Sequence, residues 1–284
     1  MDLRTLVAHA IDEDLGPGDL TTEATVDARA TGSGVVRAKQ DLVVCGHEVA
    51  REVFDEVGRR TGGALAYEVL KPDGTAVARG TEIARVHGSL RTLLIGERTA
   101  LNFLMRLCGI ATNVRAYVEA AGEGGPRVVD TRKTTPLHRA LEKLAVRTGG
   151  AANHRFALYD GVLIKDNHIT AGGGITAAVH RARAHAHHLV RIEVEVADLD
   201  GLREALDAGA DAVLLDNMSD EALAEAVRFA RARRPEVLLE ASGNMDPTRI
   251  AAIRDLGLDF VSAGGLIHQA RWVDLSLKIV QDAG

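Results

Sequence analysis

The regular alternation of strand-like and helix-like segments after Gly125-Pro126 constrains the fold more than any other feature of this sequence. Runs of β-branched and aliphatic residues are separated by stretches with helical spacing of apolar residues, which predicts a parallel sheet, open or closed. The stretch from Asp207 to Val213 is echoed from Asp255 to Val261, and each copy reads as a helix end, a glycine and the next strand. Repeated units with short connections favour an α/β barrel over a sandwich. The six predicted strands are residues 127–129, 162–164, 191–196, 212–215, 237–240 and 260–262.

The region before Gly125 lacks this alternation and predicts a mixed α/β arrangement that contains a hairpin. Apolar residues at helical spacing indicate a helix over residues 3–14, which Gly16-Pro17-Gly18 ends. The other predicted elements are a strand pair within 33–44, a helix at 47–57, strands at 66–70 and 82–86 with a turn at 72–74, and a helix from 89 to about 121 that is interrupted at Gly109.

Composition excludes several classes of protein. The chain has 284 residues, 46% hydrophobic, with no apolar run of about 18 residues, so we expect a cytoplasmic protein without a signal peptide or a membrane partner. Cys45 and Cys108 are far apart and form no CxxC pair, so neither a disulfide framework nor a zinc site is indicated. A net charge of -6 and 3% aromatic residues argue against nucleic acid as the main partner.

Positive charge is nevertheless concentrated in one stretch, from Arg127 to His168. It holds eight Lys or Arg against four Asp or Glu, whereas the whole chain has 34 basic and 40 acidic residues. Arg132, Lys133 and Lys165 follow predicted strands directly, and such a cluster suits a small, multiply anionic ligand that carries phosphate or carboxylate groups. A solvated basic face is the alternative interpretation.

Polar groups follow five of the six predicted strands, and in the sixth, Glu195 lies near the strand's end, within EVEV. In α/β barrels catalytic groups collect at the carboxyl ends of the strands, so these clusters predict one shared site. Glu195 and Asp216 are candidates to hold Mg²⁺ or ribose hydroxyls, unless they are only structural partners of a nearby Lys or Arg. The glycine-containing turns after the last two strands predict a phosphate site. The clusters are 130–133, 165–168, Glu195, Asp216-Asn217, Ser242-Gly243-Asn244 and Gly264-Gly265.

Two further groups of residues have competing interpretations. Lys165 also fits a Schiff-base lysine, although nothing local would activate its amine. His185, His187 and His188 lie at a predicted helix end without an acidic or Cys partner at ligand spacing, so we interpret them as solvated. From its helical spacing alone, Arg98 reads as an exposed or snorkelling residue.

The motifs DTRKTTP, LEKLAVRTGG, NHR, LIKDNHI, EVEV, LLDN and EASGN, with the early DLGPGDLTTEAT, together resemble quinolinate phosphoribosyltransferase. The resemblance runs from about Asp14 to Ser276. It implies a type II phosphoribosyltransferase fold, in which residues 1–108 form an α/β sandwich domain joined by the tail 269–284, and residues 109–268 form an incomplete α/β barrel. It also implies an enzyme that transfers phosphoribosyl from phosphoribosyl pyrophosphate to quinolinate with loss of CO₂.

The resemblance implies roles for individual residues. Those expected to hold the two carboxylates of quinolinate are Arg132, His154, Arg155 and Lys165, with Arg98 from a neighbouring subunit of a dimer or of a hexamer built as a trimer of dimers. Those expected to serve phosphoribosyl pyrophosphate and its Mg²⁺ are Lys133, Glu195 and Asp216, with Ser242, Gly243, Asn244, Gly264, Gly265 and His268 around the phosphates. Catalysis would fall to Lys133, Lys165, Glu195 and Asp216.

The sequence departs from the family pattern at three places. Leu137-His138 stands where the family usually has Gly and Leu, Leu144 where it has Tyr, and the run from Thr148 to Ala151 where it has Cys followed by three Gly. The alternatives to the main reading are a related phosphoribosyltransferase-like protein of molybdate-transport gene clusters, a Schiff-base aldolase, and an anion-binding protein without activity.

Overall fold

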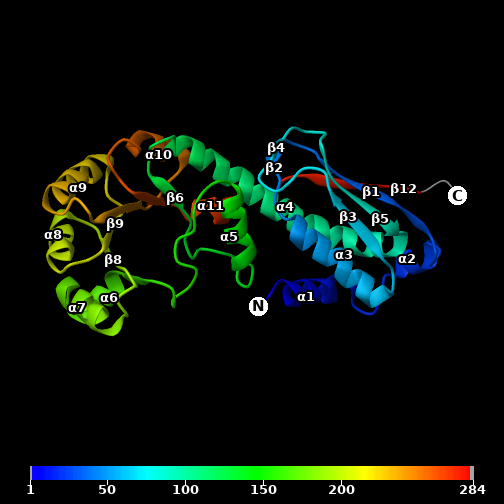
Figure 1. Ribbon diagram of the computed structural model, residues 1–284, viewed down its shortest axis with the longest axis horizontal. Coiled ribbons are helices and arrows are strands. Elements are labelled where there is room, and N and C mark those ends of the chain that lie inside the picture. The colour runs from blue at the N-terminus through cyan, green and yellow to red at the C-terminus, as the bar shows by residue number, and fades with distance from the viewer. Residues whose placement is uncertain (1, 282–284) are drawn as a thin grey trace. The chain divides into compact units, whose positions relative to one another are not determined.

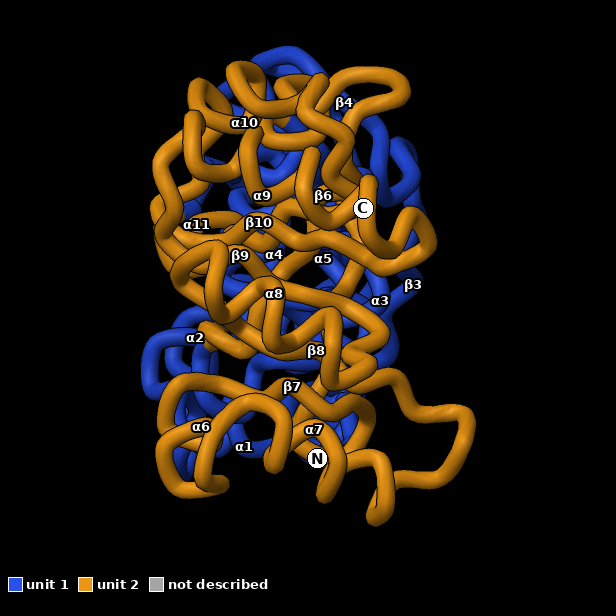
Figure 2. Tube along the Cα trace, turned by 90° about the vertical axis from the view of Figure 1, so that its left-hand side faces the viewer, with its two compact units in different colours: residues 1–115, 135–150, 270–284 blue, residues 116–134, 151–269 orange. Residues whose placement is uncertain are grey.

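The computed structural model describes residues 2–281, which form two compact units (Figure 2). The first unit contains residues 1–115, 135–150 and 270–284, and the second contains residues 116–134 and 151–269. Residues 109–115 and 135–150 belong to the first unit together with the N-terminal residues. The sequence led us to expect that the first domain would end near residue 108. The domain limits of 1–108 and 109–268 stay a prediction.

The first unit is built on a four-stranded antiparallel sheet with the order β12-β1-β5-β3, beside a two-stranded sheet of β2 and β4 (Figure 1). Its helix α3 buries the apolar face formed by residues such as Val53 and Phe54. The elements are α1 (Leu3–Leu15), α2 (Leu20–Thr25), β1 (Thr31–Ala38), β2 (Leu42–Val43), α3 (His47–Thr61), β3 (Leu65–Val69), β4 (Ala76–Val77), β5 (Glu82–Ser89), α4 (Leu90–Ala121, which continues into the second unit), α5 (Arg139–Thr148) and β12 (Leu275–Gln281).

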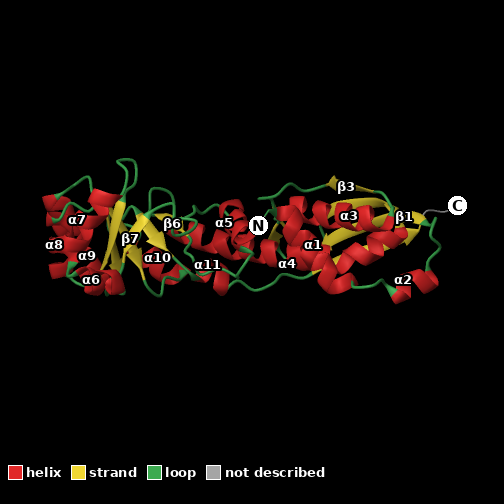
Figure 3. Cartoon of the chain, turned by 90° about the horizontal axis from the view of Figure 1, so that it is seen from below, coloured by secondary structure: helices red, strands yellow, loops and turns green. Residues whose placement is uncertain are grey.

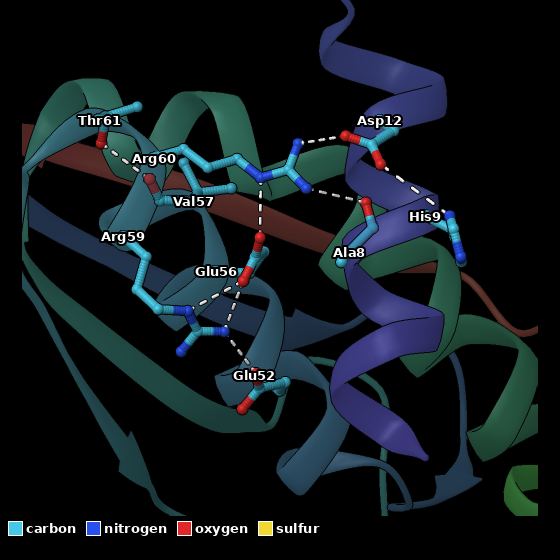
Figure 4. Close-up of polar contacts among 9 residues, drawn as sticks. All are labelled: Ala8, His9, Asp12, Glu52, Glu56, Val57, Arg59, Arg60 and Thr61. Carbon is cyan, nitrogen blue, oxygen red and sulfur yellow. Dashed lines mark hydrogen bonds and ion pairs between the residues drawn. The ribbon is translucent and has the colours of Figure 1, made fainter. Parts of the chain in front are cut away.

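A polar contact joins α3 to α1 on the surface of this unit (Figure 4). Arg60 donates to Oδ1 of Asp12 at 2.6 Å and to the carbonyl of Ala8 at 3.0 Å, while its Nε donates to Glu56 at 2.8 Å. Arg60 therefore links the two helices by donating hydrogen bonds to both a carboxylate and a backbone carbonyl oxygen of α1.

Two expectations for this unit were wrong. The strands within residues 33–44 do not pair with each other, because β1 is flanked on both edges by β12 and β5, and β2 pairs with β4 instead. Gly109 does not interrupt the helix, since α4 is continuous from Leu90 to Ala121. A Cβ atom at Gly109 would lie 2.2 Å from the carbonyl oxygen of Arg271, so the glycine permits close packing.

The second unit is an open parallel α/β barrel with the strand order β6-β11-β10-β9-β8-β7 (Figures 1 and 3). All six strands lie where the sequence predicted them, and β6 and β7 are the two edges of the sheet. The strands are β6 (Arg127–Val129), β7 (Val162–Ile164), β8 (Ile192–Val196), β9 (Ala212–Asp216), β10 (Leu238–Ser242) and β11 (Phe260–Ser262). The helices are α6 (Asp166–Gly172), α7 (Ile175–His185), α8 (Leu199–Asp207), α9 (Asp220–Arg233), α10 (Pro247–Ile253) and α11 (Gly265–His268).

The internal repeat has the same structure in both copies. Gly209 and Gly257 take the left-handed φ values of 83° and 90° that follow a helix end. Asp211 accepts bonds from the backbone N–H of Ile192 and from an arginine of α7, each at 2.7 Å. Asp259 accepts the equivalent pair, from the N–H of Leu239 and from an arginine of α9, also at 2.7 Å. These aspartates are therefore structural, since each one fastens a strand start to a helix.

Within residues 2–281, no helix is long and apolar enough to cross a membrane.

Leu137, one of the departures from the family pattern, has an unfavourable backbone conformation. Its φ is 69°, in the left-handed region, and its side chain is 68% exposed. Leu137→Gly should remove the conformational strain of a left-handed leucine, about 1–2 kcal/mol. The greater entropy of glycine in the unfolded state offsets part of this gain, so we expect the free energy of unfolding to rise by about 1 kcal/mol. The midpoint of urea unfolding measures this. Leu158→Gly is the control, because Leu158 is also exposed but its φ is not positive, and a fall of equal size in both variants would contradict the account.

Candidate active site

One cavity of about 760 Å³ at the carboxyl ends of the barrel strands collects the predicted site residues of the second unit. The sequence expectation of a single shared site is met in this geometry, because every strand-end cluster contributes at least one side chain or backbone segment. The predicted residues that line it are Arg132, Lys133, His154, Arg155, Lys165, Glu195, Asp216, Ser242, Gly243, Asn244, Gly264, Gly265 and His268. Arg98 is an exposed residue of α4 in the first unit, and its role at another subunit's site stays a prediction.

The cationic end of the cavity is formed by Arg132 and Arg155, with Lys165 at the end of β7. Arg155 is anchored by its Nη1, which donates to the carbonyl of Gly161 at 2.9 Å. Burial lowers the pKa of Arg155, and the positive charge of Arg132 lowers it further. Two guanidinium groups that repel each other in one cavity are stabilised when an anion lies between them.

A fully buried aspartate positions this cationic end. Asp130 ends β6 and accepts a bond from Nδ2 of Asn153 at 2.7 Å and another from the backbone N–H of His154 at 2.9 Å. These bonds hold the loop that carries His154 and Arg155 against the strand end. Sequence reasoning placed Asp130 in a strand-end cluster but assigned it no role.

Two acidic residues, Glu195 and Asp216, also line the cavity. Glu195 forms an ion pair with Lys165, and Asp216 accepts a hydrogen bond from Nδ2 of Asn217 at 2.7 Å. Neither carboxylate belongs to a group of three or more acidic, His or Cys side chains that lie close together, within the part of the chain that is described. A Mg²⁺ ion held here would therefore need oxygen ligands from substrate, which is how Mg²⁺ commonly binds beside phosphates.

Part of the cavity is built from backbone turns that need small residues. Gly243 has a φ of 98°, and a Cβ atom there would lie 2.2 Å from Oδ1 of Asn217. A Cβ atom at Gly264 would lie 2.8 Å from Cδ of Lys133 and 3.0 Å from Nε2 of His268. Glycine at these positions lets a lysine and a histidine approach the turns, which suits the recognition of phosphate groups.

Sequence reasoning missed two acidic residues beside His154: Glu240, which lines the cavity, and Glu193, which lines a neighbouring cavity. Nε2 of His154 lies 3.1 Å from Oε2 of Glu193 and 3.6 Å from Oε2 of Glu240. The EVEV pattern held the signal, because alternate residues of a strand point to the same face, so Glu193 and Glu195 share one face of β8. The histidines at 185, 187 and 188 are exposed, as the sequence indicated.

The fold and the cavity define an α/β-barrel protein whose candidate site combines cationic side chains with glycine turns. Two family models match the chain: the N-terminal domain of quinolinate phosphoribosyl transferase over residues 19–108 and its C-terminal domain over residues 110–278. The chain belongs to the quinolinate phosphoribosyl transferase family. The resemblance inferred from the motifs, and the fold that it implied, are confirmed.

Similar proteins of known name or structure span nearly the whole chain. A probable nicotinate-nucleotide pyrophosphorylase (carboxylating) of Synechocystis is 41% identical over 270 residues, which is 95% of this chain and 90% of that protein. The nicotinate-nucleotide pyrophosphorylase (carboxylating) of Mycobacterium leprae is 39% identical over 97% of this chain and 96% of its own length. The crystal structure of NadC from Streptococcus pyogenes superimposes with a TM-score of 0.92 at 39% identity, covering 98% of this chain and 96% of that one.

Proposed function

We propose that the protein transfers the phosphoribosyl group of phosphoribosyl pyrophosphate to quinolinate and releases pyrophosphate and CO₂, forming nicotinate mononucleotide in de novo NAD biosynthesis. One observation carries the proposal beside family membership: a single cavity holds two arginines and a lysine together with glycine turns, a second lysine and a histidine. The first group suits a dicarboxylate, and the second suits a phosphorylated sugar.

The cationic end fixes the pyridine ring. Arg132, Arg155 and Lys165 bind the two carboxylates of quinolinate, and His154 lies against Arg155 on the same wall. Two anchored carboxylates restrict the rotation of the ring and direct its nitrogen toward the ribose. The ring nitrogen already has a lone pair, so the attack on ribose C1 needs no general base.

The acidic and phosphate-binding groups favour departure of pyrophosphate. Glu195 and Asp216 lie beside the ribose, where their negative charge stabilises an oxocarbenium-like centre. Lys133 and the turns at Ser242-Gly243-Asn244 and Gly264-Gly265, with His268, bind the phosphates. Mg²⁺, held by Glu195 and Asp216 together with substrate oxygens, supplies positive charge that offsets the charge of the leaving group.

We also propose that the protein is a cytoplasmic homo-oligomer, a dimer or a trimer of dimers. Both cysteines are buried, and neither forms a disulfide, which suits a reducing compartment. Arg98 is exposed on α4 and available to another subunit, where it would add a cation to the quinolinate end of that subunit's cavity.

A direct assay tests the proposed function. We expect purified protein with Mg²⁺, phosphoribosyl pyrophosphate and quinolinate to form nicotinate mononucleotide, identified by mass spectrometry, together with CO₂ and pyrophosphate in equal amounts. Chelation of the metal should abolish the reaction, and nicotinate should not replace quinolinate, because it lacks one of the two anchored carboxylates. Absence of product under conditions where a related enzyme is active would reject the assignment.

A further inference from the structure

Three titratable side chains, His154, Glu193 and Glu240, meet beside the candidate active site, and the proposed function assigns no role to Glu193 and Glu240. Both carboxylates face Nε2 of His154, at 3.1 and 3.6 Å. Within residues 2–281, this is the one group of three or more His, Cys or acidic residues whose potential ligand atoms lie within 4.8 Å of one another. Such a group can hold either a metal ion or protons.

The hydrogen bonding of His154 distinguishes these two possibilities. The backbone N–H of Arg155 donates to Nδ1 of His154 at 2.7 Å, so Nδ1 acts as an acceptor. The proton of the neutral ring is then on Nε2, which faces the two carboxylates. A metal ion would need the Nε2 lone pair that this proton occupies. The geometry therefore favours a cluster that holds protons.

Glu240 is the member of the cluster best suited to carry a proton. Its side chain is 5% exposed, and its Oε1 has no hydrogen-bond partner. Burial, together with the charge of Glu193, raises the pKa of Glu240 to about 7, although a protonated His154, a hydrogen bond with Ser262 and the charge of Lys165 act in the opposite direction. The neighbouring strands place uncharged Leu214 and Phe260 beside it in register. A carboxyl group in this setting retains its proton near neutral pH.

Glu240 also lies between two cavities. It lines the candidate active site, and with His154 and Arg155 it lines a second cavity of about 220 Å³. Many side chains of the second cavity are apolar, among them Val129, Val162, Ala212, Leu238 and Phe260. The carboxyl group of Glu240 can therefore contact a substrate in the candidate active site, while the second cavity gives access to the cluster of Glu240, His154 and Glu193.

We propose that Glu240 is the acid that replaces the departing carboxyl group of quinolinate with a proton, an inference that rests on the function proposed above. Once the ring nitrogen has bonded to ribose, the bond between the adjacent ring carbon and its carboxylate breaks. As CO₂ leaves, the electron pair of that bond develops on the carbon beside the cationic nitrogen. In the same step Glu240 donates its proton to this pair, which forms the C–H bond of the product, and Glu240 becomes a carboxylate. CO₂ release therefore depends on the acidic proton. A solvent proton that passes through His154 restores the acid.

The proposed binding of quinolinate supports this role. Arg155 and Lys165 line the same cavity as Glu240, and the charge of Lys165 acts on the Glu240 carboxyl group. A charged Glu240 would repel the bound dianion, whereas the neutral acid does not. Binding of quinolinate therefore favours the protonated form that the reaction then uses.

The matched variant is Glu240→Gln, which keeps the shape of the side chain and removes its acidic proton. We expect pyrophosphate release to continue while CO₂ release slows by about 100-fold, the usual scale for loss of a general acid. A nucleotide that retains both carboxyl groups should accumulate and be visible by mass spectrometry. Glu225→Gln, an exposed residue of α9, is the control and should behave as the wild type.

The variant is expected to fold. The pKa of Glu240 is raised above its ordinary 4.5, so the folded state binds more protons than the unfolded state, and this group's contribution to stability falls as pH rises from 4.5 through about 7. Glutamine cannot ionise, so above pH 7 thermal unfolding of Glu240→Gln should occur at a temperature no lower than for the wild type. A second measurement needs no variant: in the wild type, the ratio of CO₂ to pyrophosphate should fall as the pH is raised well above 7.

Three results would overturn the proposal. They are equal slowing of pyrophosphate and CO₂ release in Glu240→Gln, a wild-type ratio of CO₂ to pyrophosphate that stays constant at high pH, and a stoichiometric transition metal in the purified wild type that Glu240→Gln loses. Failure of the wild type to form any nucleotide would instead overturn the proposed function, so the two failures are distinguishable.

Discussion

Arg132→Ala is expected to weaken quinolinate binding by more than about 2 kcal/mol, or about 30-fold in Kd, because the variant loses a planar donor pair that meets a carboxylate. In the free protein Arg132 is exposed, and its charge contributes, after burial, to the lowered pKa of Arg155. The protein thus holds two like charges together, and a dianion between them removes their repulsion. Calorimetric titration of the protein with quinolinate measures the loss directly.

Two further variants identify the cause of that loss. Arg132→Lys keeps the charge but not the planar fork, so its affinity should lie between those of the wild type and Arg132→Ala. Arg228→Ala removes an exposed arginine of α9 and should leave the affinity unchanged, which controls for net charge. Equal affinity in Arg132→Ala and the wild type would exclude Arg132 from the quinolinate end of the cavity.

The parts of the fold that depend on local pattern could be predicted from the sequence. The six barrel strands were found because their apolar, β-branched runs are visible locally, and left-handed glycines such as Gly209 and Gly257 precede some of them. The errors arose where distant residues decide the structure. β1 pairs with β12, more than 200 residues later, and Gly109 packs against the backbone of Arg271. Neither contact can be predicted from the residues near it in the sequence.

The candidate site could be predicted only where position in the strand repeat and residue type agreed. Lys133, Lys165 and Asp216 follow strand ends, and the rule for parallel barrels places them in one cavity. Glu193 and Glu240 lie within strands, where a polar residue more often indicates an exposed face. Their burial beside a histidine becomes visible only when the sheet is assembled, because β8 and β10 are separated by β9.

Sharing of active sites between subunits would have a large and measurable effect on mixed oligomers. By the resemblance to its family, this protein is expected to complete each cavity with Arg98 from another subunit. Arg98→Ala should then remove a cation from the partner's site, and Lys165→Ala should inactivate the site of its own barrel, because it removes a cation of the quinolinate end and leaves Glu195 without its ion-pair partner. Each variant alone is expected to lose most of its activity.

Mixing the two variants should restore activity that neither has alone. In a dimer with one subunit of each kind, the barrel that retains Lys165 receives Arg98 from the Lys165→Ala subunit, so one of its two sites is intact. Random exchange makes about half of the dimers mixed, and the expected activity is about one quarter of the wild type. Native mass spectrometry verifies that mixed dimers form, and two differently tagged Lys165→Ala preparations serve as the control. If verified mixed dimers show no more activity than the separate variants, Arg98 acts within its own subunit or not at all, because an intact shared site would otherwise be present in each of them.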